Sequence, residues 1–598
     1  MAEKGAPPTF KYQGRSYMAR SPGTARNLNT AWWDASQIYG YDEASRRRMR
    51  RDPTDRAKLQ LVNQHSGTIG DEQGYLPDFG PACTGGAPAT GCDPIRPEWT
   101  GQEAAAMPDN WSIGLSFLHT VFVREHNAIV NAFRKFARDN ADADSGLRNP
   151  ERPTEPILYG KISNDELFEI ARLIVSAEIA KIHTIEWTTQ LLYDEPLQIG
   201  MNANWSGVFK DDAIASDVTK RIVRKLADSS KPKLANQFFS ALAAGPGIFG
   251  AGSDRPYPEG VNDGPNHFGA PFNFPEEFVS VYRLHPLVPD MIEYREMSEP
   301  NKIAKHVPVI DTFRGKATAR MREGGLSNWA LSMGRQRLGL LELNNHPQFL
   351  QNLDIRPRLD VTLDVAALDI IRDREHGVPR FNEFRRQIGL RQLTSFDDFI
   401  DKTLPADSSI RKEQEGNAKT LREVYGQHVC DAGKVITAAQ LDKDNKPIND
   451  CLGRPNGSMV DNVEDVDITV GFLGEPVRPH GYAISETQFQ IFILNASRRL
   501  FSDRFFTSSF RPEFYTQFGV DWVMNNGPDG TVMEEGEPNG HKQEVLPMKR
   551  VLLRVMPELK DELKTVVNAF DPWARDRGRY YTLDWKPRPG AESDPAFK

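Results

Sequence analysis

Hydrophobic residues recur at helical spacing in several long segments of the chain. Between positions 112 and 139, apolar side chains repeat every three or four residues, which predicts a long amphipathic helix. Positions 165–192 predict a second long helix, with Asn164 as a possible cap and acidic residues in the first turn. Helices are also predicted around Tyr282, over residues 361–390 and over residues 485–506, where we expect the last strong helix of the chain.

Glycine, proline and polar residues interrupt these helices in several places. Residues 1–30, 70–110 and 195–275 are predicted to be irregular, and residues 427–462 are interpreted as a polar insertion. Strand signals are few, and neither an internal repeat nor a clear linker divides the chain. We therefore predict a mainly α protein with few short strands, in which residues 1–598 form one large domain.

Composition and charge exclude some classes of protein. The chain has 39% hydrophobic and 26% charged side chains, which is typical of a globular protein with a large core. Its formal net charge of −8 argues against a nucleic-acid-binding protein, since such proteins are usually basic. No apolar run approaches the ~18 residues of a membrane-spanning helix, and the N-terminus shows no signal peptide. We expect a soluble protein that is cytoplasmic or peripherally bound to a membrane.

The four cysteines form two local pairs. Cys83 and Cys92 lie in the loop PACTGGAPATGC, and Cys430 and Cys451 flank a polar segment. Either pair could close a surface loop in an oxidising compartment. Neither pair has zinc-finger spacing, because no second Cys/His pair lies nearby. The sequence leaves open whether these cysteines are disulfide-bonded.

A tyrosine stands three residues before a histidine in the stretch FVSVYRLHPLVPD. Positions i and i+3 share a face of a helix, so the Tyr282 phenol and the His285 imidazole could reach one object from the same side. The alternative is an ordinary helix end with one buried aromatic residue and one capping histidine.

Oxygen-bearing residues alternate in the stretch TAWWDAS. Thr30, Asp34 and Ser36 carry side-chain oxygens, and the carbonyl of Trp32 can fill the gap between them. Such alternating donors suit a hard cation such as Ca²⁺. Only one of them is a carboxylate, so further ligands would have to come from elsewhere. The alternative is a tight turn that is capped by serine and aspartate.

Two further groups of polar residues interrupt apolar helices. His183 and Thr188 lie in the second long helix, where they are either hydrogen-bonded within the core or form a polar anchor at the end of an apolar pocket. Arg498 and Arg499 lie on the helix over 485–506. Arginine is the preferred bidentate partner of a carboxylate, but it is also common in salt bridges at helix ends.

Together these segments resemble one family, the fatty-acid α-dioxygenases of the peroxidase–cyclooxygenase superfamily of haem proteins. The resemblance runs from about Asn29 to Phe514, and it is interrupted around residues 75–100 and 427–462. Seven blocks carry it in the same order: TAWWDASQIYG, LHTVFVREHNAIV, AKIHTIEWTTQLL, GMNANWSGV, EEFVSVYRLHPLVPD, AALDIIRDREHGVPRFNEFRR and ASRRLFSDRFFT. It implies a large, helical, haem peroxidase-like fold.

The resemblance also implies a haem centre. It assigns His285 as the proximal ligand of the iron of haem b, with Asn345 hydrogen-bonded to that histidine. It assigns Tyr282 as the residue that becomes a radical and attacks the substrate. Plain peroxidases of the superfamily do not usually have a tyrosine at this position, so Tyr-x-x-His favours an oxygenase.

The remaining groups map onto substrate and calcium sites of the family. His183, Thr188 and either Arg498 or Arg499 correspond to anchors of the fatty-acid carboxylate, whereas Thr30, Trp32, Asp34 and Ser36 correspond to a calcium loop. The implied reaction uses peroxide to form the tyrosyl radical. The radical removes hydrogen from Cα of the fatty acid, O₂ adds, and the resulting 2-hydroperoxide can lose CO₂ to give a shortened aldehyde.

One element of the family pattern is not found in the sequence. The family's distal histidine and a neighbouring aspartate precede the calcium loop, yet no histidine precedes Thr30 here. His65, the first histidine, follows the loop and is a poor substitute. A more distant start, a truncated chain, a second chain or a relic without turnover would each explain this, and we expect a missing N-terminal segment. The alternatives to the oxygenase are a peroxidase of small donors and a catalytically impaired haem- or lipid-binding protein.

Overall fold

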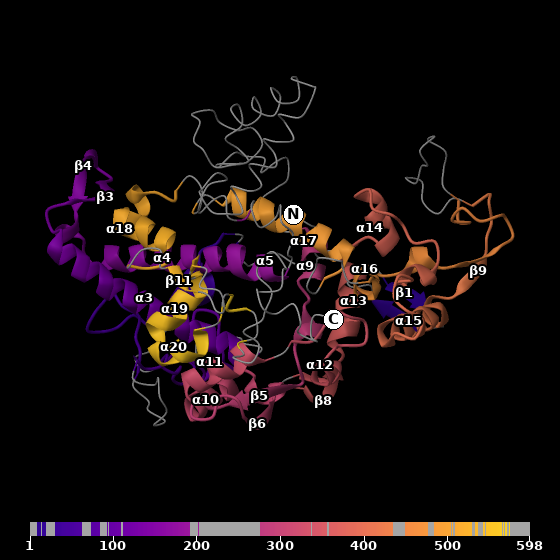
Figure 1. The fold of residues 1–598 in the computed structure, drawn as a ribbon, viewed down its shortest axis with the longest axis horizontal. Helices are drawn as coiled ribbons and strands as arrows, with labels where there is room; N and C mark the ends of the chain where they lie inside the picture. Colours follow the sequence, from indigo (N-terminus) through magenta and orange to yellow (C-terminus); the bar gives the residue numbers. More distant parts are fainter. Residues whose placement is uncertain are drawn as a thin grey trace, which may run out of the picture.

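The fold is mainly α-helical, which confirms the predicted class (Figure 1). The computed structural model describes residues 9–12, 15–18, 30, 32–62, 73–83, 92–93, 95–108, 112–191, 201, 275–336, 338–355, 358–434, 449–476, 484–503, 505, 509–528, 533–535, 542–544, 546–564, 566, 568–570 and 573. The predicted loop over 195–275 and the candidate His65 lie outside these residues, apart from positions 201 and 275.

The α-helices of the described residues are α1 (Ser36–Tyr39), α2 (Glu43–Arg46), α3 (Ile113–Asp139), α4 (Asn164–Ile182), α5 (Thr188–Leu191), α9 (Glu276–Val281), α10 (Gly315–Gly324), α11 (Leu326–Arg335), α12 (Gln348–Gln351), α13 (Val365–Glu375), α14 (Phe381–Gln387), α15 (Ser409–Tyr425), α16 (Ile468–Gly474), α17 (Glu486–Ser502), α18 (Pro512–Asn525), α19 (Pro547–Val555) and α20 (Lys560–Leu563). A π-helical turn, η4 (His183–Trp187), joins α4 to α5.

Strands occur only as short antiparallel pairs within the described part of the chain. They are β1 (Thr9–Tyr12) with β2 (Arg15–Met18), β3 (Asp144–Asn149) with β4 (Arg152–Leu158), β5 (Met291–Arg295) with β6 (Ile303–Pro308), β7 (Leu353–Ile355) with β8 (Arg358–Leu363), β9 (Gln427–Val429) with β10 (Met459–Asp461), and β11 (Met533–Glu535) with β12 (Lys542–Glu544). Each pair joins two strands that are neighbours in the sequence, so the strands form separate small hairpins and the core is helical.

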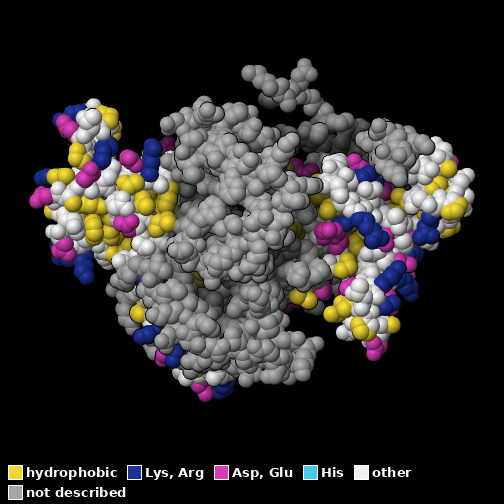
Figure 2. Space-filling model, turned by 45° about the horizontal axis from the view of Figure 1, so that its top comes forward, with side chains coloured by type: hydrophobic (Ala, Val, Ile, Leu, Met, Phe, Trp, Pro, Cys, Tyr) yellow, Lys and Arg dark blue, Asp and Glu magenta, His cyan; other side chains and the backbone are white. Residues whose placement is uncertain are grey.

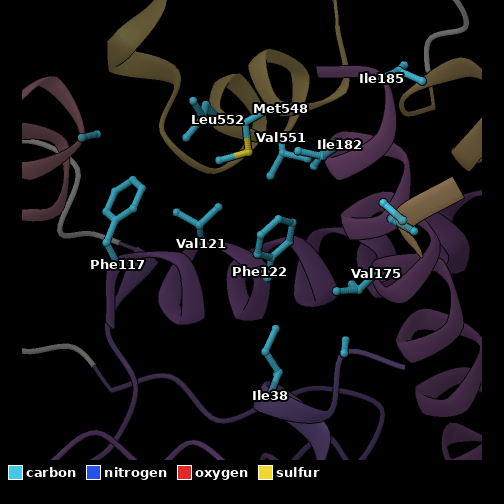
Figure 3. Packing of buried hydrophobic residues seen from close by; sticks show 14 of the residues in the cluster. Ile38, Phe117, Val121, Phe122, Val175, Ile182, Ile185, Met548, Val551 and Leu552 are labelled. Carbon is cyan, nitrogen blue, oxygen red and sulfur yellow. The ribbon is translucent and has the colours of Figure 1, made fainter. Parts of the chain in front are cut away.

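The core forms where α3, α4 and α19 pack together. In Figure 3, Phe117 and Phe122 of α3 point toward Met548 and Leu552 of α19, with Ile182 at the end of α4 beside them. The amphipathic pattern of α3 explains this arrangement, because its apolar stripe is buried. One hydrophobic cluster contains residues from position 35 to position 573, and on this ground we propose that the chain forms one domain.

Several predicted boundaries are wrong. Ser163, and not Asn164, caps α4, since its hydroxyl accepts the N–H of Glu166 while the Glu166 carboxylate accepts the N–H of Ser163. The region 361–390 begins in β8 and is then divided into α13 and α14, because Gly377 has a positive φ and Pro379 cannot continue a helix. Residues 485–506 do not hold the last strong helix, since α18 and α19 follow, and the predicted irregular N-terminus contains the β1–β2 hairpin.

The polar insertion over 427–462 contains the β9–β10 hairpin, which the Cys430–Cys451 disulfide closes. The other pair, Cys83 and Cys92, is also disulfide-bonded. On the face drawn in Figure 2, acidic and basic side chains of the described residues are interspersed, as a modest net charge would produce. Among the helices that the structure describes, none combines the length and hydropathy that membrane crossing requires.

Candidate active site

Tyr282 and His285 lie at a break between two helical segments. Helix α9 ends at Val281 with Tyr282 as its C-cap, and a 3₁₀ turn begins at His285. The two residues therefore do not share a face of one continuous helix. A helix does end here, as the alternative expects, but Tyr282 is 38% exposed and the helix cap is Tyr282, not His285. Pro286 explains the break, because it has no N–H to donate and disfavours α geometry at the preceding residue.

A buried carboxylate lies beneath His285. Oδ2 of Asp369 on α13 is 3.0 Å from Nδ1 of His285, although the N–H direction is off the line that a hydrogen bond requires. Arg283 holds Asp369 in place, with Nε 3.3 Å from Oδ1 and Nη1 donating to the Asp369 backbone oxygen. Because Nδ1 faces Asp369, Nε2 is the nitrogen that can coordinate a metal.

Asn345 binds the backbone around His285, whereas the sequence predicts a hydrogen bond to the His285 ring. Its amide donates to the backbone oxygens of Pro286 at 3.0 Å and Leu340 at 2.8 Å, and so it fixes the chain that follows His285. Gly339 permits this close packing, since a Cβ there would lie 2.2 Å from the Pro286 oxygen. The sequence interpretation missed Asp369, although an aspartate among the apolar residues of AALDII was a signal that it is buried with a partner.

The π turn brings His183 and Thr188 together. Thr188 N–H donates to the His183 oxygen five residues earlier, and Thr188 Oγ1 lies 3.3 Å from His183 Nδ1. In an α-helix, residues five apart point about 140° away from each other, because each residue turns by about 100°. The wider π turn reduces this angle, so both polar groups reach the same side of the helix.

Aromatic rings enclose His183. The Trp33 and Trp187 rings lie 4.8 and 4.9 Å from the imidazole, measured between centroids. Burial lowers the pKa of His183 from its ordinary value to about 4, so the ring is neutral at neutral pH. His183 can therefore bind an anion through an N–H group but not as a cation.

A single phenylalanine connects the Tyr282 turn to the π turn. Phe492 on α17 stacks against Tyr282 with 4.6 Å between ring centroids, and its ring is 5.9 Å from that of Trp187. Figure 1 shows α5, α9 and α17 near the centre of the molecule. Although 38% of the Tyr282 surface is exposed, burial by its apolar surroundings raises the pKa of the phenol above its ordinary value. The phenol is thus protonated at neutral pH.

The predicted calcium loop forms a capped turn. Thr30 Oγ1 accepts the N–H of Trp32 at 3.1 Å, and Asp34 Oδ1 accepts the N–H of Ser36 at 3.0 Å. No cluster of three or more His, Cys, Asp or Glu suited to a metal occurs among the residues described above. The capped-turn alternative accounts for these contacts, and calcium remains a prediction. Arg498 and Arg499 belong to α17, but their side chains lie outside the described part of the structure.

Glu186 lies inside the π turn and is completely buried. Both of its carboxylate oxygens face the N–H of Met548, at 3.1 and 3.2 Å. Burial raises the pKa of this carboxyl to about 8, so Glu186 is protonated in the folded protein at neutral pH. No pattern in the sequence distinguishes this residue from an ordinary surface glutamate.

The stability of the unmodified protein should fall as the pH rises, because of Glu186. Glu186→Gln is expected to abolish this pH dependence. Unfolded Glu186 ionises near its ordinary pKa of 4.5, whereas folded Glu186 keeps its proton up to about pH 8. Unfolding therefore releases a proton in this window, and stability falls with increasing pH by at most about 1.4 kcal/mol per pH unit. Urea unfolding midpoints at both ends of the window measure the difference between the two proteins.

The exposed Glu155 provides the matched control, because Glu155→Gln should retain the pH dependence of the unmodified chain. If Glu186→Gln also retains it, Glu186 is already ionised in the folded protein.

Most of the chain matches one family of known proteins. The model of the animal haem peroxidase family matches residues 7–245, 257–439 and 429–529. The chain is 31% identical over 525 residues to α-dioxygenase PIOX of Pisum sativum and 30% identical over 565 residues to α-dioxygenase 2 of Arabidopsis thaliana. These alignments cover 86% and 92% of the chain but only 61% and 66% of the two relatives, so the chain spans less than two thirds of their length.

A solved structure agrees with these sequence matches. The crystal structure of Oryza sativa fatty acid α-dioxygenase superimposes with a TM-score of 0.58 and 27% identity, and covers 92% of this chain and 67% of that one. A structure of a variant of the rice enzyme with palmitic acid gives a TM-score of 0.59. Since the family model matches most of its length, the chain belongs to the animal haem peroxidase family and, within it, is similar to the α-dioxygenases.

Proposed function

We propose that the protein is an α-dioxygenase, which uses haem and a Tyr282 radical to oxygenate fatty acids at Cα. The observation that carries this proposal is the position of Tyr282. It caps α9 three residues before His285, and through Phe492 it shares one aromatic cluster with the His183–Thr188 pair. A candidate metal ligand, a candidate radical and a candidate carboxylate anchor thus lie on neighbouring elements.

The donor set around His285 fits a haem. Its Nδ1 faces Asp369, its Nε2 is the ring nitrogen that would coordinate iron, and 23% of its side chain is exposed. A haem bound there would supply the oxidising power by reacting with peroxide. The residues of this chain would then hold the substrate and pass hydrogen from it.

His183 and Thr188 would bind the fatty-acid carboxylate through hydrogen bonds. If Thr188 donates to Nδ1, the neutral imidazole carries its proton on Nε2 and can donate that N–H to the carboxylate. Arg498 or Arg499 of α17 would be the ionic partner of that carboxylate, as the resemblance implies. Fixing the head group would place Cα beside the Tyr282 phenol, and this explains attack at Cα.

The reaction would proceed in three balanced steps. Tyr282 loses one electron and its phenolic proton. The phenoxyl oxygen then takes one hydrogen atom from Cα, which restores the phenol and leaves a carbon radical. O₂ adds to that carbon, and a further hydrogen atom, returned from Tyr282, gives the 2-hydroperoxy acid and renews the tyrosyl radical.

Oxygen uptake by the full chain, loaded with haem and given palmitate with trace hydroperoxide, tests the proposal. We expect uptake together with a 2-hydroperoxide or the aldehyde one carbon shorter. Methyl palmitate is the matched control, because it has the same chain without the anionic head group, and it should give little uptake. Oxidation of small donors without uptake on palmitate would instead establish a peroxidase. Haem or fatty-acid binding without either activity would establish a binding protein.

Replacing Asp369 with asparagine is expected to weaken haem binding by about 10- to 100-fold. The carboxylate increases the electron density of the imidazole that faces it, and the neutral amide does so less. The iron should therefore become easier to reduce. Titration with haem and the midpoint potential of the bound iron measure these two effects.

Asp407, which is exposed on a loop, offers a control, since Asp407→Asn should change neither quantity. An unaltered midpoint potential in Asp369→Asn would show that Asp369 does not act on the iron ligand.

Calcium at Thr30, Trp32, Asp34 and Ser36 is also part of the proposal. The alternating oxygen donors support it, and Asp503 adds a buried carboxylate next to the loop by accepting the Trp33 N–H at 2.8 Å. The local hydrogen bonds of Thr30 and Asp34 would have to be exchanged for the ion.

A further inference from the structure

Five rings form a continuous path from the Tyr282 turn to the N-terminal loop. Tyr282 stacks on Phe492 at 4.6 Å with 24° between ring planes, and Phe492 lies 5.9 Å from Trp187. Trp187 stacks on His183 at 4.9 Å with 29° between planes, and His183 lies 4.8 Å from Trp33. The path crosses α9, α17 and the π turn before it reaches the N-terminal loop.

Only some of these rings can hold a radical. Tyrosine and tryptophan lose an electron at accessible potentials, whereas phenylalanine and neutral histidine do not. Burial keeps His183 neutral, with a pKa of about 4, so it cannot provide a charge in the path. Trp187 is therefore the first oxidisable ring beyond Tyr282 along the path, and one phenylalanine separates the two. Trp33 is the next one.

We propose that Trp187 is a secondary radical site, which reduces the Tyr282 radical when no fatty acid is in place. One electron passes from the Trp187 indole to Tyr282, a proton joins the phenoxyl oxygen, and the indole N–H loses a proton. The phenol is restored and a neutral tryptophan radical remains, so atoms and electrons balance without another oxidant. This inference rests on the proposed function, because the Tyr282 radical is its only source of oxidising power.

The geometry suits a transfer that competes with substrate oxidation. Trp187 follows Glu186 in the same π turn that brings His183 and Thr188 together, so it lies beside the proposed carboxylate anchor. A bound fatty acid would present its Cα hydrogen directly to the phenol, and the radical would react there. In an empty site the electron would come from Trp187 instead, and the oxidising equivalent would be stored away from the iron ligand.

Freeze-quench electron paramagnetic resonance of the haem-loaded full chain tests this inference. The chain is prepared with ring-deuterated tyrosine or ring-deuterated tryptophan and mixed with an organic hydroperoxide. We expect an early signal that narrows with labelled tyrosine, followed by one that narrows with labelled tryptophan. Trp187→Phe should abolish the second signal and prolong the first by about tenfold or more, and palmitate should suppress the second signal in the unmodified chain.

Two control variants, Trp99→Phe and Trp187→Tyr, show whether the decay of the tyrosine signal depends on an oxidisable ring at position 187. Trp99→Phe is the matched control, since Trp99 is buried in a separate small cluster and should leave both signals unchanged. Trp187→Tyr keeps an oxidisable ring, so the early tyrosine signal should be replaced by a second tyrosine signal with a different hyperfine pattern, whereas in Trp187→Phe the early signal should persist unchanged in shape. This difference separates electron transfer from a packing defect in Trp187→Phe. A tyrosine signal that decays equally in the unmodified chain and Trp187→Phe overturns the inference alone. The absence of any tyrosine signal overturns the proposed function and the inference with it.

Discussion

Tyr282→Phe is expected to abolish fatty-acid-dependent oxygen uptake, with a loss of at least about a thousandfold. Phenylalanine has no O–H group to oxidise, so no oxygen radical can form beside Cα. The substituted ring can keep the stacking with Phe492 at 4.6 Å and the contact with Phe278, so the α9 turn should be preserved. The haem spectrum and the oxidation of small donors by hydroperoxide should therefore be retained.

Tyr41 provides a matched control for this substitution. It is 39% exposed, against 38% for Tyr282, and it belongs to no part of the proposed site. Tyr41→Phe should retain full oxygen uptake with palmitate. Undiminished uptake in Tyr282→Phe would disprove the radical role of this residue, and oxidation of small donors would then be the better account of the chain.

Arg554→Met is expected to lower the free energy of unfolding by about 3–5 kcal/mol, because it leaves buried carboxylates without their cation. Arg554 on α19 contacts Glu125 of α3, with Nη2 2.6 Å and Nε 2.9 Å from Oε1, and its Nη2 lies 3.1 Å from Oε1 of Glu178 on α4. Burial and the neighbouring Glu125 already raise the pKa of Glu178. The loss should therefore be smaller in mild acid, where protonation relieves the repulsion. Urea unfolding at two pH values measures it.

The triple variant Arg554→Met/Glu125→Gln/Glu178→Gln tests the cause of this loss. It removes the two carboxylates with the cation and should recover most of the stability. Arg152→Met, which breaks the exposed pair with Glu155, should cost only about 0–1 kcal/mol. If the triple variant is as unstable as Arg554→Met, lost packing of the arginine, and not exposed buried charge, explains the effect.

Periodicity predicted the long helices well but not their ends. The apolar stripe of α3 can be recognised in the sequence, because apolar residues recur every three to four positions wherever the helix is taken to begin. The cap of α4 was misplaced by one residue, since Ser163 and Asn164 are both good caps and only the Glu166 contact distinguishes them. The sequence analysis did not predict helix α18, which is interrupted at Thr516 by a positive φ.

The candidate site was partly predictable. Tyr282 and His285 could be singled out from their own chemistry and from one short motif. The partner of His285 could not, because Asp369 is 84 positions away and only the packing of α13 against α9 brings it there. The pairing of His183 with Thr188 was equally hidden, since five residues is the wrong spacing for any regular α-helix.

The π turn has a consequence for the length of this helix. A regular α-helix turns by about 100° per residue, so the deletion of one residue between His183 and Trp187 would rotate α4 and α5 by about that angle against each other. The side chains on one of the two helices would then leave their present packing. Substitutions within the turn keep this register, whereas a deletion of one residue does not.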